Sequence, residues 1–212
     1  MWAGWTSASR VGGRWLVLFV GCVIWGLGIV MTVKGRLGVA PWEVLQVAVS
    51  HISGLSLGRI GQLIGLFLVV LTFVVARIRP DWATLVTMFF VGFFVDVWYP
   101  HVPDVANLWA RAVMLVGGTV VIGFATGLYL KADLGAGPRD CAMFAIRKLT
   151  GRSIRFSRTI LEMMALVIGI ALGGPIGWGT LLYAVIIGPI VQFFIHVLGG
   201  TADQATVSSD AG

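Results

Sequence analysis

The chain matches itself when it is shifted by 97 residues, and this duplication limits its fold more than any other feature. The segment Lys34–Glu43 falls on Lys131–Asp140, and both copies carry lysine, Leu-Gly, proline and an acidic residue in the same register. After a one-residue deletion, the segment that begins at Trp82 falls on the one that begins at Trp178, and both read Trp-x-Thr-Leu. Such registers are rare by chance, so the sequence predicts two copies of one folding unit.

Each copy contains apolar runs that are long enough to cross a bilayer. The chain has 58% apolar residues and only 11% charged residues, whereas soluble domains carry about a quarter charged residues. Its mean hydropathy is +0.96, and about 20 apolar residues in a helix span the ~30 Å hydrocarbon core. The predicted spans are 15–33, 59–77 and 83–99 in the first copy, and 112–130, 156–173 and 178–198 in the second.

A short segment that begins with proline follows the first span of each copy. The segments 41–52 and 138–149 carry an acidic residue two positions after that proline, as in the first turn of a helix. About 12 residues rise only ~18 Å, so these helices are too short to cross the ~30 Å core. The predicted fold is an all-α polytopic membrane protein with two three-span repeats, each with a short broken or re-entrant helix, and about six crossings.

The distribution of basic residues indicates how the two repeats are oriented. If the short helices do not cross, the second repeat is inverted, with eleven Lys and Arg residues inside and four outside; if they cross, the repeats are parallel, with nine inside and six outside. The positive-inside rule favours inversion. We predict a cytoplasmic segment 1–13, repeats 14–100 and 111–198, and a polar tail 199–212, with both termini in the cytoplasm.

The motifs of the repeats resemble a bacterial family. The Lys-x-x-Leu-Gly-x-x-Pro-Trp-[Asp/Glu] turn at 34–43, the Ser-Gly-Leu-Ser segment at 53–56 and the Trp-x-Thr-Leu span start are similar to YczE/YitT-type integral membrane proteins. The resemblance covers about 26–197. The chain departs from the pattern at Arg36, where Asp is common, and at Arg139, where Trp is common. The resemblance implies a bacterial inner-membrane protein and little about chemistry.

The paired turns supply the candidates for substrate binding. In transporters with broken helices, the positive ends of the half-helices point at anionic groups near the bilayer midplane. The predicted substrate-binding residues are Lys34, Pro41, Trp42, Glu43, Lys131, Asp133, Pro138, Arg139 and Asp140. The structural alternative is that Glu43 and Asp140 only complement their own helix dipoles and pair with Lys34 or Lys131.

Two carboxylates inside the predicted spans are candidates for proton coupling. Glu162 and Asp96 qualify because an ionisable group inside a membrane bundle is costly and is a functional candidate by default. The structural alternative for Glu162 is a salt bridge to Arg155 or Arg158 at helical spacing. For Asp96 it is solvation near the outer interface.

These features favour a small secondary transporter or exporter of a polar, anionic or zwitterionic metabolite. The alternative is a membrane-embedded regulator of another protein, which has no transport of its own and docks through the basic segment Arg147–Arg158. No metal-ligand spacing, catalytic motif or phosphate loop occurs in the sequence, so we expect neither an enzyme nor a cofactor. The basic residues lie between apolar runs, which disfavours nucleic acid. Glycines four residues apart permit a homodimer as well as intramolecular packing.

Overall fold

The chain forms a bundle of helices in a computed structural model that describes residues 8–135 and 137–198. Within these ranges every regular element is an α-helix, which confirms the predicted all-α class. The helices are α1 (Ala8–Gly35), α2 (Pro41–Ser53), α3 (Leu57–Ala76), α4 (Trp82–Trp98), α5 (Leu108–Ala132), α6 (Pro138–Thr150), α7 (Ile154–Ala171) and α8 (Trp178–Val197). The predicted polar tail lies outside the described residues.

The short helices α2 and α6 exist where the sequence predicts them, each 13 residues long. Pro41 and Pro138 stand in their first turns, where a missing N–H costs no hydrogen bond. Gly54 and Gly151 end them in the left-handed conformation, with φ of 71° and 65°. Because this region favours glycine, the chain turns sharply after each short helix and enters the next long one.

The helices that follow, α3 and α7, begin in the same way. Ser56 and Ser153 are their N-caps, and the serine oxygens accept hydrogen bonds from the backbone N–H groups of Arg59 and Phe156. Such a cap satisfies one of the free donors of the first turn and contributes about 1 kcal/mol. The corresponding elements of the two halves therefore start with the same local chemistry.

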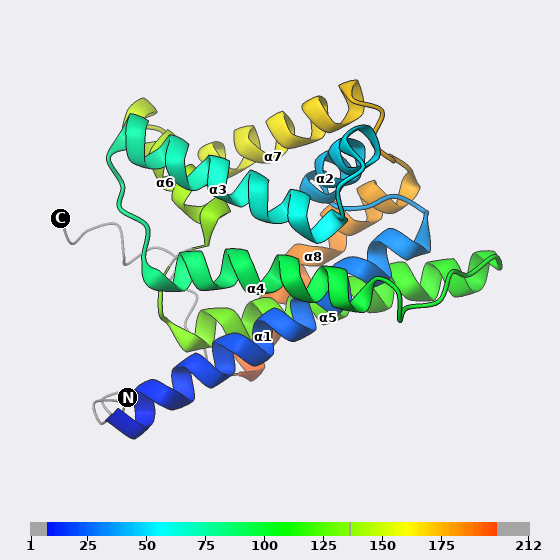
Figure 1. The fold of residues 1–212 in the computed structure, drawn as a ribbon, viewed down its shortest axis with the longest axis horizontal. Coiled ribbons are helices and arrows are strands. Elements are labelled where there is room, and N and C mark those ends of the chain that lie inside the picture. The colour runs from blue at the N-terminus through cyan, green and yellow to red at the C-terminus, as the bar shows by residue number, and fades with distance from the viewer. Residues whose placement is uncertain (1–7, 136, 199–212) are drawn as a thin grey trace.

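The helices form two groups, which Figure 1 shows one above the other. One group contains α1, α4, α5 and α8, and the other contains α2, α3, α6 and α7. Helices α1 and α5 are the central antiparallel pair, because the Arg14 Nε at the start of α1 donates to the Ala132 oxygen at the end of α5, 2.7 Å away. Gly28 and Gly118 let their backbones approach closely, since a Cβ on either would come within 3.0 Å of the other's carbonyl oxygen.

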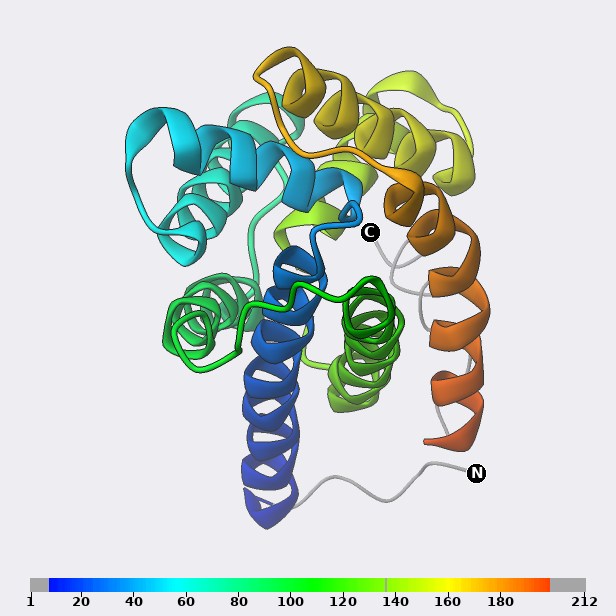
Figure 2. The same cartoon turned by 90° about the vertical axis from the view of Figure 1, so that its right-hand side faces the viewer.

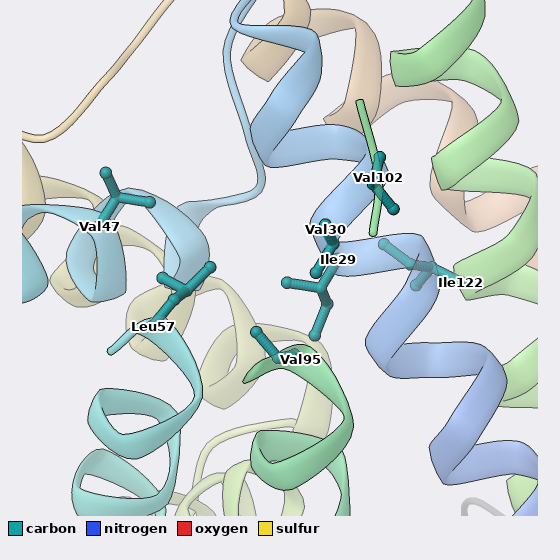
Figure 3. Packing of buried hydrophobic residues seen from close by; sticks show 7 residues of the cluster. All are labelled: Ile29, Val30, Val47, Leu57, Val95, Val102 and Ile122. Atoms are coloured by element: carbon teal, nitrogen blue, oxygen red, sulfur yellow. The ribbon is translucent and has the colours of Figure 1, made fainter. Parts of the chain in front are cut away.

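A buried apolar cluster joins the two groups (Figure 3). It consists of Ile29, Val30, Val47, Leu57, Val95, Val102 and Ile122. These side chains come from α1, α2, α3, α4, α5 and the α4–α5 loop, so every element of the first half contributes. Val47, in the middle of α2, lies beside Leu57 at the start of α3, so the cluster helps to position the short helix (Figure 3).

The surface of the bundle is apolar in the manner of a membrane protein. Large side chains such as Phe67, Val74 and Val185 are more than half exposed, as expected where lipid replaces water. Four described helices are long and apolar enough to cross a membrane: Val11–Gly35, Leu57–Ala76, Leu108–Ala132 and Trp178–Val197. Of the other two predicted spans, α4 has only 17 residues, and α7 carries Arg155, Arg158 and Glu162 within 18 residues.

Candidate functional site

The first turns of α2 and α6 meet through a buried ion pair. The Arg139 Nη2 of α6 lies 3.3 Å from the Glu43 Oε1 of α2. The Glu43 side chain is only 3% exposed, whereas that of Arg139 is 36% exposed. A buried charge is costly without a partner, and Arg139 supplies the opposite charge from the other half of the chain.

Trp42 packs against the same arginine. The Arg139 guanidinium carbon lies 5.0 Å from the centre of the Trp42 ring, within the range of a cation–π interaction. Trp42 is 4% exposed and also contacts an apolar cluster that contains Met143 and Leu161. Residues 42 and 139 occupy equivalent positions in the two copies, so at this point the two halves touch through corresponding residues.

Two polar atoms beside this ion pair lack a conventional hydrogen bond among the described residues. The Glu43 Oε2 is buried and has no donor. The Trp42 indole Nε1 lies near enough to the Glu162 carboxyl to interact with it electrostatically. No acceptor among the described residues, however, lies in hydrogen-bonding geometry to this nitrogen. A buried acceptor without a partner costs about 1–3 kcal/mol, so these atoms identify a place where a ligand or a proton can be accommodated.

Glu162 of α7 and Tyr183 of α8 complete this group. The charged groups that act on the Glu162 carboxyl are Arg139, Glu43 and Arg158. The same three charges, together with that of Glu162, also act on the Tyr183 hydroxyl. The junction cluster therefore consists of Trp42, Glu43, Arg139, Glu162 and Tyr183. It joins α2, α6, α7 and α8 with residues up to 141 positions apart in sequence.

The equivalent acid of the second half has a different role. The Asp140 Oδ2 accepts a hydrogen bond of 3.2 Å from the Gly137 N–H at the start of α6. Asp140 thus complements its own helix, which is the structural alternative foreseen for it. Glu43 does not behave in this way, because it pairs with Arg139 rather than with Lys34 or Lys131, and the predicted structural partner for Glu43 is wrong.

The remaining predicted substrate-binding residues lie in other contacts. The Lys34 Nζ is 2.8 Å from the Asp104 Oδ2 and 4.6 Å from the centre of the Tyr99 ring. This hydrogen bond, with the nearby charges of Lys34 and Arg36, lowers the pKa of Asp104. Lys34 therefore fastens the α4–α5 loop to the end of α1.

At the corresponding end of α5, Asp133 faces Arg14 rather than the junction cluster. The Asp133 Oδ2 lies 3.2 Å from the Arg14 Nη2. The neighbouring Lys131 is exposed. Of the predicted substrate-binding residues, the structure thus brings Trp42, Glu43 and Arg139 together. Lys34 and Asp133 instead form ion pairs at the two ends of the α1–α5 pair.

Asp96, the second candidate for proton coupling, anchors the start of α3. Its carboxylate accepts hydrogen bonds from the Gly58 N–H at 2.7 Å and the Ser56 hydroxyl at 2.6 Å. Both donors belong to the N-terminal turn of α3, where an anion is favourable. These contacts give Asp96 a structural role and leave Glu162 as the candidate nearer to the paired motif.

Sequence reasoning missed Tyr183. It stands five residues after Trp178 within an apolar span, and a hydroxyl in such a position was the available signal. Arg158 was considered as an ion-pair partner of Glu162. It acts on that carboxyl, but the described side chains include no pair of the two within 4.0 Å. The side chain of Arg155 lies outside the described part of the chain.

No metal centre emerges from the described residues. Within residues 8–135 and 137–198, no three His, Cys, Asp or Glu side chains gather closely enough to hold a metal ion. A depression lined by Phe73, Val74, Arg77 and Arg79 lies around the end of α3 and shares no residue with the junction cluster.

Comparison with known proteins identifies one family. The family of unknown function DUF6198 matches residues 12–196. The uncharacterized membrane protein YczE of Bacillus subtilis is 33% identical over 181 residues, which cover 85% of this chain and 84% of YczE. The uncharacterized protein YyaS of the same organism is 31% identical over 188 residues, or 87% of this chain and 94% of YyaS. An uncharacterized protein of Haemophilus influenzae is 32% identical over 182 residues, or 86% and 83%.

These matches confirm the resemblance to YczE that the turn motifs predict. They also agree with the apolar surface of the bundle, since YczE is described as a membrane protein. No solved structure matches the chain.

Proposed function

Since the chain belongs to the DUF6198 family, together with membrane proteins such as YczE, we propose a function from the geometry of its junction cluster. It is a small secondary transporter or exporter of a polar, anionic or zwitterionic metabolite. It acts in the bacterial inner membrane, with both termini in the cytoplasm. It needs no cofactor, and it carries its substrate without altering it chemically.

The observation that carries this proposal is the buried, half-satisfied carboxylate of Glu43. One of its oxygens pairs with Arg139, and the other has no donor among the described residues. Membrane proteins retain costly buried charges chiefly where ions or substrates pass. A partly exposed guanidinium beside that carboxylate offers a second, oppositely charged contact to a polar ligand.

The arrangement of the two halves supports the inverted-repeat part of the proposal. Helices α1 and α5 are the first spans of the two copies, and they pack antiparallel (Figure 1). Gly26 of α1 packs against Phe94 of α4, and their equivalents, Gly123 of α5 and Ile190 of α8, pack against each other as well. Transporters built from inverted repeats bind substrate between the repeats at discontinuous helices, and the contact of the junction cluster between the first turns of α2 and α6 supports a similar site here.

The regulator alternative receives less support from the geometry. Part of its docking segment serves the chain itself, because the Lys148 Nζ donates to the Ala76 oxygen at the end of α3, 3.0 Å away. The positive-inside rule also accounts for basic residues in this segment. A regulator would co-purify with a protein and would show no flux of its own.

Flux in proteoliposomes tests the proposal. The full chain is reconstituted and screened for uptake of amino acids, organic acids and amines. For any substrate found, Glu43→Gln and Arg139→Gln should each lower the initial rate at least tenfold. Asp104→Asn is the matched control, since it removes a carboxylate that lies in an exposed ion pair. If all three variants transport like the wild type, the junction cluster is not the substrate site.

A further inference from the structure

The two halves of the bundle differ in how the last two helices of each half pack. In the first half, α3 lies tightly on α4, and a Cβ on Gly58 would come within 1.9 Å of the Gly92 oxygen. The Gln62 Nε2 donates to the Phe89 oxygen at 2.8 Å across the same contact. The α3–α4 contact is therefore closed by glycine packing and by hydrogen bonds.

The equivalent contact of the second half is open. Gly188 of α8 stands 96 residues after Gly92, and a Cβ on it would meet nothing within 4 Å. Ala184, one turn earlier, is also exposed. In the described part of the chain, α7 packs on α2 and α6 but not along α8, and Figure 2 shows α8, in orange, running away from α7, in yellow. We call this open contact the α7–α8 seam.

Two residues of the junction cluster belong to the two helices of the α7–α8 seam. Glu162 belongs to α7, and Tyr183 of α8 directly precedes Ala184. Glu162 stands 97 residues after Gly65, and a Cβ on Gly65 would lie 2.7 Å from the Met88 side chain. At this position the first half therefore has Gly65 in contact with Met88, and the second half has Glu162, whose carboxylate interacts with the charges of Glu43 and Arg139.

The charges of the cluster favour one class of ligand. Glu43 pairs with the partly exposed guanidinium of Arg139, and a second carboxylate, Glu162, interacts with the charges of Arg139 and of the exposed Arg158. Among the described residues, no donor reaches the buried Glu43 Oε2. A ligand that carries only negative charge would add repulsion here, whereas an ammonium group supplies the missing donors. A carboxylate on the same ligand can form a charge-assisted hydrogen bond with the partly exposed guanidinium of Arg139.

We propose that the α7–α8 seam admits an amine-bearing zwitterion of the amino-acid class to the junction cluster. Its ammonium group binds Glu43 and Glu162, and its carboxylate binds Arg139. This inference rests on the proposed function and narrows its substrate class. It excludes the purely anionic ligands that the helix N-termini alone would favour.

Ligand fragments test the chemical class. Thermal unfolding of the full chain in detergent is followed with the twenty L-amino acids, with amines that lack the carboxylate, and with acids that lack the amino group. We expect one or more amino acids to raise Tm, the matching amine to bind more weakly, and the matching acid to have no effect. Glu43→Gln and Glu162→Gln should raise Kd at least tenfold, and Asp104→Asn should leave it unchanged. Binding of the acid but not the amine overturns the inference, as does a folded protein that no amino acid or amine stabilises.

The seam itself is tested by filling it. Gly188→Leu is compared with Gly12→Leu, because a Cβ at either glycine meets nothing within 4 Å and neither φ is positive. We expect Gly188→Leu to retain the wild-type Tm but to slow uptake of the bound amino acid at least fivefold, whereas Gly12→Leu leaves uptake unchanged. Equal uptake by the two variants overturns the seam as the route.

The two proposals fail in different ways. Amino-acid binding without flux in wild-type liposomes contradicts the transporter and preserves the ligand site. Flux of organic acids alone preserves the transporter and overturns the amine-bearing class.

Discussion

The ion pair between Glu43 and Arg139 should contribute measurably to the free energy of unfolding. Removing one partner of a fully buried pair costs about 3–5 kcal/mol, whereas an exposed pair contributes about 0–1 kcal/mol. Here the carboxylate is 3% exposed and the guanidinium is 36% exposed, so the pair lies between these limits. We expect Arg139→Gln to lower the free energy of unfolding by about 2 kcal/mol, because it leaves the Glu43 carboxylate buried without its counter-charge.

A double-mutant cycle isolates this interaction. Glu43→Gln keeps the shape of the side chain and removes its charge, so the double variant should be more stable than the sum of the two single losses predicts. A coupling energy of about 1–2 kcal/mol is expected for residues in direct contact. The assay is reversible unfolding in detergent at fixed pH and salt. If the two single effects add to within about 0.5 kcal/mol, the contact between the short helices does not stabilise the fold and the reasoning is refuted.

Three further predictions concern stability. The pKa of Asp104 is lowered by Lys34, so the stability that Asp104 contributes is present above its unfolded pKa and is lost as the pH falls through its folded pKa. Asp104→Asn should remove that part of the acid dependence in unfolding experiments between about pH 1 and 5, the range in which a carboxylate with a lowered pKa loses its charge. Gly58→Ala should destabilise by about 3 kcal/mol because its Cβ would meet backbone, while Gly188→Ala should be neutral, and equal melting temperatures would contradict this packing. Asp96→Ala should cost about 2 kcal/mol because two donors at the start of α3 lose their acceptor, and unchanged stability would show that water replaces it.

Sequence reasoning succeeded where local chemistry decides the structure. Pro41 and Pro138 start the short helices, and Gly54 and Gly151 end them, each within one residue of the predicted boundary. Proline and glycine restrict the backbone at their own positions, so their effect can be read from the chain without tertiary information.

The partners in the site depended on tertiary packing. The repeat showed that Trp42 and Arg139 are equivalent, but equivalence does not reveal whether two residues touch, so Glu43 was matched with the nearest lysines in sequence. Tyr183 was missed for the same reason, since only tertiary packing brings α8 near the start of α2, where the Gly179 N–H donates to the Leu37 oxygen. The spans 83–99 and 156–173 stay predictions, because α4 has 17 residues and α7 carries three charged residues.

The contact between Trp42 and Arg139 has a consequence for the internal repeat that the sequence predicts. In a symmetric dimer of single repeats, the residue at this position would face its own copy: two arginines would repel each other, and two tryptophans would offer no cation. Joining both copies in one polypeptide frees the position from this self-complementarity. One copy can then carry the aromatic ring and the other the cation. For the same reason, Glu43 can pair with the other half of the chain while Asp140 bonds only to the start of its own helix.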